Sequence, residues 1–133
     1  MELVILIVVL ALLEYIVLSY QVGMARVKYN IKAPAITGHP VFERRLRIQQ
    51  NTIEQLIIFL PAIFSFSYVA ESIGWPGYET AAFLGVIFVI GRALYARSYV
   101  RDPATRALGF MMTMVPCVIM LVGTLIGVLI SIM

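Results

Sequence analysis

The sequence predicts an all-α integral membrane protein, built as a bundle of four transmembrane helices. Of its 133 residues, 62% are hydrophobic and only 13% are charged, and the mean hydropathy is +0.97. A soluble domain of this size would need much more charge on its surface. The apolar segments are continuous and do not alternate with polar residues, which favours helices over the strands of a membrane barrel. The length fits a single transmembrane domain over residues 1–133.

Four segments are long and apolar enough to cross a bilayer, because about 20 helical residues span ~30 Å of hydrocarbon. The first segment contains one charge, Glu14, and lacks the basic start and cleavage site of a signal peptide, so we expect it in the mature protein. Stretches with proline and glycine separate the segments, and Asp102 and Pro103 suit the N-cap and first position of the last helix. The expected spans are 3–22, 48–70, 77–99 and 105–132.

The basic residues are sorted to one side of the predicted bundle. All ten lie in or beside the first and third connections, whereas the second connection has only Glu71 and Glu79. By the positive-inside rule, we expect the first and third loops to face the cytoplasm and both termini to face the opposite side. The pI near 9.2 then reflects topology, and we expect no nucleic-acid partner. The basic residues are Arg26, Lys28, Lys32, Arg44, Arg45 and Arg47 around the first loop, and Arg92, Arg97, Arg101 and Arg106 around the third.

A polar stripe begins the second predicted helix. On a helix that turns about 100° per residue, Arg47, Gln50, Asn51 and Glu54 fall within an arc of roughly 100°. Charges at membrane depth cost about 2.5 kcal/mol or more, and they normally face a bundle interior or a wet cavity. Two interpretations are open: an Arg47–Glu54 pair that holds helices together, or a site for a zwitterion, with Arg for carboxylate, Glu for ammonium and Asn for amide. Gln49 lies on the opposite face, about 200° away, and suits a pocket on a neighbouring subunit.

Polar residues recur in the third and fourth predicted helices. Arg92, Tyr95 and Tyr99 are spaced i, i+3 and i+7 and therefore share one helix face, although interfacial tyrosines are also common in membrane proteins. Arg106 falls in the first turn of the fourth helix, where the helix dipole disfavours a cation. An arginine and a helix N-terminus together favour an anion, which a substrate or a phospholipid headgroup would supply.

Two isolated groups, Cys117 and Glu14, are candidates for further sites. Cys117 is the single cysteine, so it forms neither an internal disulfide nor a multi-thiolate metal site, and we expect a packing role and no metal. Glu14 is a lone carboxylate, for which we expect a structural pair or a protonated, hydrogen-bonded acid. Small proton-coupled multidrug transporters also have a lone carboxylate in their first helix and remain an alternative, although the sorted charges argue against that class.

Two segments resemble conserved motifs of the MAPEG family, the membrane-associated proteins of eicosanoid and glutathione metabolism. Residues 42–54, FERRLRIQQNTIE, are similar to the family's motif F-E-R-x-x-R-x-x-x-N-x-x-E. Residues 92–110, RALYARSYVRDPATRALGF, resemble its second conserved region. The family's arrangement of four spans in a chain of similar length also matches, so the resemblance covers nearly the whole sequence.

The resemblance implies a homotrimer in membrane lipid that binds glutathione between neighbouring subunits, near the cytoplasmic side. It implies a glutathione transferase of detoxification, which activates the thiolate for attack on lipophilic electrophiles, with lipid hydroperoxide reduction as a second activity. The alternative within the family is a non-enzymatic lipid-binding scaffold. Where leukotriene-forming members have two consecutive arginines, this chain has Arg26 and Val27, which disfavours leukotriene synthesis. By position, Arg106 matches the arginine that stabilises the thiolate. The residues that match glutathione-binding positions are Arg47, Asn51, Glu54, Tyr95 and Tyr99 in one subunit, with Arg26 and Gln49 from its neighbour.

Overall fold

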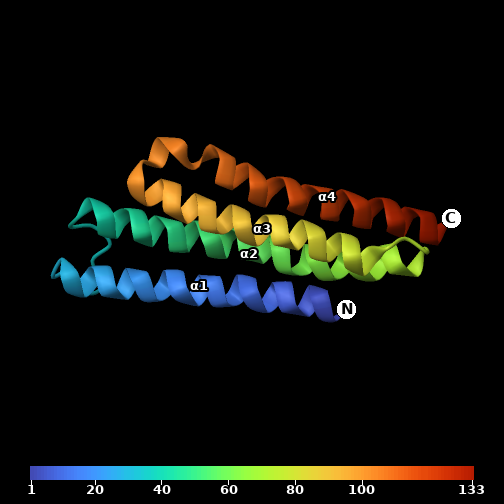
Figure 1. Cartoon of the computed structure of the whole chain (residues 1–133), viewed down its shortest axis with the longest axis horizontal. Helices are drawn as coiled ribbons and strands as arrows, with labels where there is room; N and C mark the ends of the chain where they lie inside the picture. The colour runs from blue at the N-terminus through green and yellow to red at the C-terminus, as the bar shows by residue number, and fades with distance from the viewer.

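The computed structural model describes all 133 residues, and it consists of four long helices that run alternately in opposite directions (Figure 1). The prediction of an all-helical protein with four helices is confirmed. Each helix has the length and hydropathy of a membrane span, with the short 3-10 turn η1 included in the fourth. The elements are α1 (Glu2–Lys28), α2 (Pro40–Ser72), α3 (Gly77–Arg101), η1 (Pro103–Arg106) and α4 (Ala107–Ile132).

The start of α2 lies at Pro40, well before residue 48, where the expected membrane span begins. His39 is the N-cap, and its Nδ1 accepts a hydrogen bond from the N–H of Val41 at 3.2 Å. Pro40 suits the first helical position because its missing N–H needs no partner there. Hydropathy missed this start because the first turns of α2 are polar. The whole polar stripe is therefore helical and is held on a rigid element.

The break between α3 and α4 follows the predicted capping, with one correction. Asp102 Oδ1 accepts a hydrogen bond from the N–H of Ala104 at 3.0 Å, and Pro103 occupies the first helical position. These residues begin η1 and not the regular helix α4. Arg106, which we expected in the first turn of the fourth helix, is the last residue of η1 and the N-cap position of α4.

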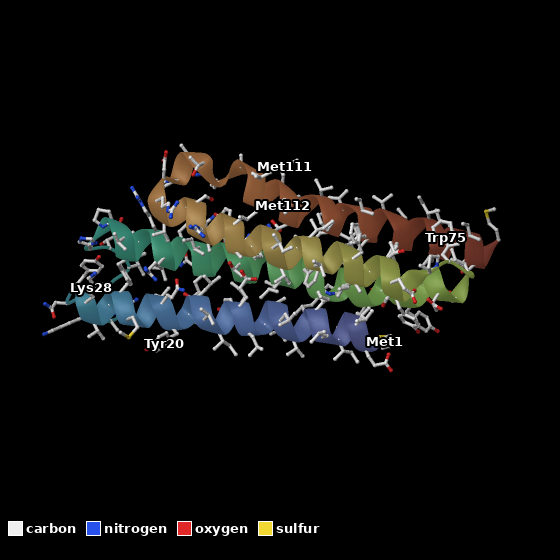
Figure 2. All side chains as sticks on the ribbon, in the orientation of Figure 1. Met1, Tyr20, Lys28, Trp75, Met111 and Met112 are labelled. Carbon is white, nitrogen blue, oxygen red and sulfur yellow. The ribbon has the colours of Figure 1, made fainter.

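The α2–α3 pair forms the centre of the bundle, and α1 and α4 pack on opposite sides of it (Figure 1). One end of the bundle, which we call the loop end, contains the first and third connections. The opposite end contains the second turn and both termini. Figure 2 shows Lys28 at the loop end, and Met1 and Trp75 at the other. The outward faces of α1 and α4 expose many leucine, isoleucine and valine side chains, as expected for contact with lipid.

The main apolar core occupies the half of the bundle away from the loop end. It consists of sixteen buried residues, drawn from the first part of α1, the second half of α2, the first half of α3 and the middle of α4. Towards the loop end of this core, the rings of Phe59 and Phe88 are stacked with 3.8 Å between their centroids. The packing that stabilises the fold and the polar residues of the stripe therefore lie in different halves of the molecule.

A close contact between α3 and α4 depends on Gly109. A Cβ atom at this position would lie 2.6 Å from the Cα of Tyr95, and a Cβ atom at Gly91 would lie 2.7 Å from the Cβ of Met112. Small residues allow membrane helices to approach each other closely. The contact at Gly109 fixes the start of α4 directly beside Tyr95, and thus beside the polar residues of α3.

We predict that Gly109→Ala destabilises the bundle, because the new methyl group would overlap the backbone of α3. Overpacking of this kind costs about 1–3 kcal/mol, so the thermal unfolding midpoint in detergent, followed by circular dichroism, should fall clearly. Gly23→Ala is the matched control, because a Cβ there meets no atom within 4 Å, and its midpoint should stay the same or rise. An unchanged midpoint in Gly109→Ala would contradict the tight α3–α4 contact.

Candidate functional site

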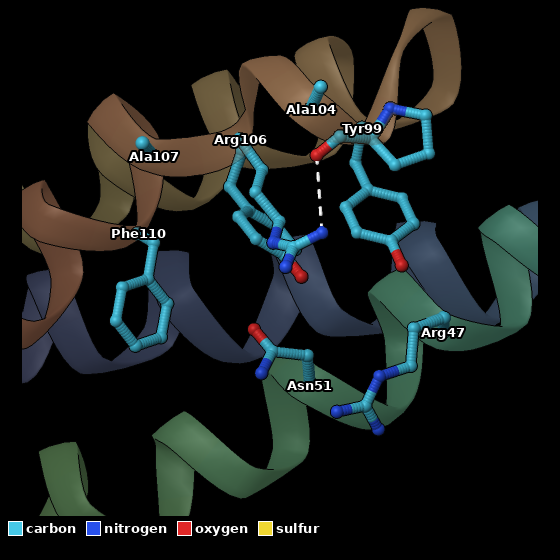
Figure 3. Close-up of a pocket in the computed structure, with 9 residues that line it drawn as sticks. Arg47, Asn51, Tyr99, Ala104, Arg106, Ala107 and Phe110 are labelled. Carbon is cyan, nitrogen blue, oxygen red and sulfur yellow. Dashed lines mark hydrogen bonds between the residues drawn. The ribbon is translucent and has the colours of Figure 1, made fainter.

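Five of the predicted site residues line one cavity at the loop end of the bundle (Figure 3). Its volume of about 550 Å³ lies in the range of small-molecule sites. Arg47 and Asn51 come from α2, Tyr95 and Tyr99 from α3, and Arg106 from η1. The other lining residues are Pro103, Ala104, Ala107 and Phe110.

Arg47 and Glu54 form an ion pair along one side of α2, with 3.2 Å between Nη1 and Oε1. Glu54 Oε2 also accepts a hydrogen bond from Nδ2 of Asn51 at 3.2 Å. Both charged side chains are about half exposed, at 50% and 52%. The predicted Arg47–Glu54 pair is therefore present, but both residues belong to the same helix, so within one chain the pair does not by itself join two helices. The pair instead presents a positive and a negative group side by side next to the cavity.

Arg92 lies buried behind these groups, with 1% of its surface exposed. Its Nη1 donates to Oδ1 of Asn51 at 3.0 Å, and its Nη2 donates to Oγ1 of Thr52 at 2.8 Å. Its guanidinium also lies over the ring of Tyr95, 4.3 Å from the ring centroid. No carboxylate oxygen lies within 4.0 Å of it. Asn51 therefore accepts from Arg92 and donates to Glu54, which fixes the orientation of its amide.

The spacing predicts that Arg92 shares a face with Tyr95 and Tyr99, but neither Arg92 nor Thr52 is among the predicted site residues. An arginine inside a membrane span is itself a signal, because it needs hydrogen-bond partners within the protein. Thr52 gave no separate signal, since threonine is common in membrane helices, where its hydroxyl can bond its own backbone. Only the packing of α3 on α2 identifies it as a partner of Arg92.

Arg106 faces Asn51 and Arg47 across the cavity (Figure 3). Its Nη1 donates to the backbone oxygen of Pro103 at 3.2 Å, and its guanidinium lies 5.7 Å from the centroid of the Tyr99 ring. No carboxylate pairs with it. A guanidinium has five N–H donors, so most of those on Arg106 are available to a ligand. The cavity lining thus contains Arg47, which is paired with Glu54, and Arg106, which has no carboxylate partner. Together with the buried Arg92 behind Asn51, this excess of positive charge favours an anion.

Arg26 and Gln49 lie outside this cavity. Arg26 Nη1 donates to the backbone oxygen of Ala35 at 2.7 Å, and its guanidinium lies 4.7 Å from the centroid of the Phe42 ring. Gln49 Nε2 donates to Oγ of Ser19 on α1 at 3.0 Å. The side of α2 that faces α1 therefore holds Gln49, opposite the polar stripe, as the helical wheel predicts. Within one chain, these two residues do not meet the other predicted site residues.

The fold and cavity together define a four-helix membrane protein with a polar, anion-favouring site at one end. Residues 4–126 match the sequence model of the MAPEG family, and the chain belongs to that family. The resemblance seen in the sequence is therefore confirmed.

Three relatives illustrate the range of similarity. An uncharacterised protein of Synechocystis sp. is 40% identical over 124 residues, which is 93% of this chain and 86% of that protein. Human microsomal glutathione S-transferase 2 is 34% identical over 96 residues, or 72% of this chain and 61% of the enzyme. Bovine leukotriene C4 synthase is 33% identical over 88 residues, or 66% of this chain and 55% of the enzyme. The chain thus aligns with less than two thirds of the length of either enzyme.

We predict that Thr52→Val destabilises the protein, because it leaves a buried N–H of Arg92 without its acceptor. Such a loss costs about 1–3 kcal/mol and should lower the thermal unfolding midpoint in detergent. Thr113→Val is the matched control. Thr113 is equally buried and donates to a backbone oxygen of its own helix, as Thr52 does, but no arginine bonds to it. An equal fall in the unfolding midpoint of the two variants would contradict the role of Thr52 as a partner of Arg92.

Proposed function

We propose that the protein is a membrane-bound glutathione transferase that activates the glutathione thiolate for attack on lipophilic electrophiles. The main support is the cavity at the loop end, where side chains from α2, α3 and η1 meet. Membership of the MAPEG family and similarity to microsomal glutathione S-transferases of several organisms add to it. Glutathione is the co-substrate, and the proposal requires no metal.

The groups around the cavity complement those of glutathione, a tripeptide with two carboxylates, one ammonium group and two amides. Arg47 suits a carboxylate, Glu54 suits the ammonium group, and the oriented side chain of Asn51 suits an amide. Tyr95 and Tyr99 add phenolic hydroxyls from α3. The net negative charge of glutathione matches a cavity lined by Arg106, which has no carboxylate partner, and backed by the buried Arg92, which has none either.

Arg106 is the proposed catalytic residue. A free thiol has a pKa near ~8.5, and only its thiolate is a good nucleophile. A guanidinium close to the sulfur stabilises the thiolate, and arginine, unlike lysine, keeps its charge in a shielded site. The thiol proton passes to water. Arg106 suits this role because it meets no carboxylate and uses one N–H on its own backbone.

The thiolate then forms a carbon–sulfur bond with an electrophile that arrives from the bilayer. With a chlorinated nitroaromatic compound, the carbon–chlorine bond breaks and chloride leaves. With a lipid hydroperoxide, two glutathione molecules become a disulfide, and the hydroperoxide becomes an alcohol and water. The protein contributes orientation and charge stabilisation, while glutathione supplies the nucleophile, so the buried Cys117 takes no part.

The complete site is proposed to form in a homotrimer, with Arg26 and Gln49 contributed by the adjacent subunit. The half-exposed Arg47 and Glu54 are consistent with a site that a neighbour covers. We further propose that the chain acts as a single domain whose loop end faces the cytoplasm and whose termini face the opposite side, following the positive-inside rule.

The scaffold and the transporter remain competing hypotheses. The scaffold hypothesis predicts that the protein binds lipid but shows no glutathione binding in a calorimetric titration. It is disfavoured because a scaffold has no need of an unpaired Arg106 that faces an oriented Asn51. Transport through Glu14 would use a different cleft, between α1 and α3, and predicts that glutathione has no effect. Wild-type protein that binds no glutathione would overturn the proposed function.

We predict that Arg106→Ala lowers glutathione conjugation of a chlorinated nitroaromatic substrate roughly a hundredfold or more, because an oriented charge at the developing anion is lost. The measurement is the conjugation rate of detergent-purified protein. Lys28→Ala is the control. Lys28 is an exposed cation at the same end that does not line the cavity, so activity should persist. Full activity in Arg106→Ala would refute the role of this arginine.

A second prediction concerns the shared site. Arg26→Ala/Gln49→Ala and Arg106→Ala should each be nearly inactive as pure oligomers. Mixed oligomers should regain activity. In some of their sites, the double variant supplies an intact Arg106 and the adjacent Arg106→Ala subunit supplies intact Arg26 and Gln49. Co-expression of two differently tagged variants, followed by tandem purification and rate measurement, tests this. No recovery in mixed oligomers would argue that each site is built within one subunit.

A further inference from the structure

A second cleft, of about 400 Å³, lies between α1 and α3. It shares no lining residue with the proposed glutathione cavity. The two helices run in the same direction (Figure 1), and each presents a single face to the cleft, because the lining positions are spaced by three and four residues. They run from Glu14 to Gln21 on α1 and from Ala93 to Arg101 on α3.

The middle of this cleft is apolar. Val17 and Leu18 line it from α1, and Ala93, Ala96 and Val100 line it from α3. The two alanines leave space between the helices that larger side chains would fill. Val17 and Ala93 are exposed, so the cleft opens sideways at the apolar surface where lipid chains would lie. Its shape and lining therefore suit a hydrocarbon chain.

The end of the cleft nearest the loops is positively charged. Arg97 and Arg101 are exposed, lie one helical turn apart, and form no ion pair with a carboxylate. Arg44 Nη1 donates to the backbone oxygens of Val100 at 3.0 Å and Arg101 at 3.1 Å. This contact covers part of the negative end of the α3 dipole, which would otherwise oppose an anion.

The remaining polar groups make the two ends of the cleft chemically different. Gln21 Oε1 accepts a hydrogen bond from Arg45 Nη1 at 2.9 Å, which leaves its NH₂ group as the donor available to a ligand. Glu14, near the middle of α1, lines the opposite end. Glu14 forms no ion pair within the chain, so the structural pair expected from the sequence is absent. It offers no positive group, so an anion finds no partner deep in the cleft. A ligand with one negative group must therefore place that group beside Arg97 and Arg101 and its apolar part between the helices.

We propose that the α1–α3 cleft binds one anionic phospholipid, with its phosphate at Arg97 and Arg101 and one acyl chain between Val17 and Ala93. The charges favour a lipid with net negative charge over a zwitterionic one, because a choline group would bring a cation to the two arginines. Basic side chains at the membrane surface each strengthen the attraction of anionic lipids. The proposed lipid site does not involve glutathione, so its test is independent of the test of the proposed transferase activity.

The test is native mass spectrometry of the detergent-purified full chain, titrated with phosphatidylglycerol or phosphatidylcholine of identical acyl chains. Wild-type protein should bind one phosphatidylglycerol per chain roughly tenfold more tightly than phosphatidylcholine, given two basic contacts. Arg97→Gln/Arg101→Gln should abolish this preference. Ala93→Leu should weaken the binding of both lipids several-fold but keep the preference for phosphatidylglycerol, because it fills the apolar part of the cleft and leaves the charges in place.

The charge-matched control is Lys28→Gln/Lys32→Gln, which removes two positive charges at the loop end outside the cleft. It should keep the preference. An equal loss in this control would show that general surface charge, and not the cleft, attracts the lipid, and would overturn the proposal. Equal binding of both lipids by wild-type protein, or displacement of phosphatidylglycerol by glycerol phosphate at the same concentration, would overturn it as well.

Discussion

The buried guanidinium of Arg92 is the constraint on which the polar half of the structure depends. Within a membrane span, a charged group has to find its hydrogen-bond partners inside the protein. Arg92 finds them on α2, at Asn51 and Thr52, and on its own helix at the face of the Tyr95 ring. These contacts fix α3 against α2 where the cavity begins. They also occupy the acceptor of Asn51, so that its donor is directed to Glu54.

The bundle separates the packing that stabilises it from the groups available to a ligand. The sixteen-residue core, which includes the stacked rings of Phe59 and Phe88, lies in the half away from the loops. At the loop end, α4 is held against α3 by a backbone contact at Gly109, which needs no large side chain. This contact keeps Tyr95 in place while the space between α2, α3 and η1 stays open. A rigid apolar half thus supports a polar half in which several charges remain exposed.

Hydropathy and helical spacing predicted the number of helices, their approximate positions and the common face of Arg47, Asn51 and Glu54. Those signals are local, because each follows from the order of residues along one helix. They missed the polar first turns of α2, and they assigned Arg106 to a regular helix where the chain forms a 3-10 turn. They also left Arg92 and Thr52 out of the site, because a helical wheel treats each helix alone. Which side chains meet across α2 and α3 depends on how those helices pack.

The arginines of α3 and η1 differ in how much of their hydrogen-bonding capacity the protein itself uses. Arg92, inside the span, is buried and held by two side chains and an aromatic ring. Arg106, at the loop end, is exposed and donates to the backbone of its own turn, while Arg97 and Arg101 are exposed and form no ion pair. The trend follows from solvation: a guanidinium inside the span takes its partners from the protein, as both Nη atoms of Arg92 do, although its Nε has none. A guanidinium at the water boundary is solvated by water. Anion-binding sites in such a bundle therefore belong at its boundary, where both the proposed thiolate site and the proposed lipid phosphate site lie.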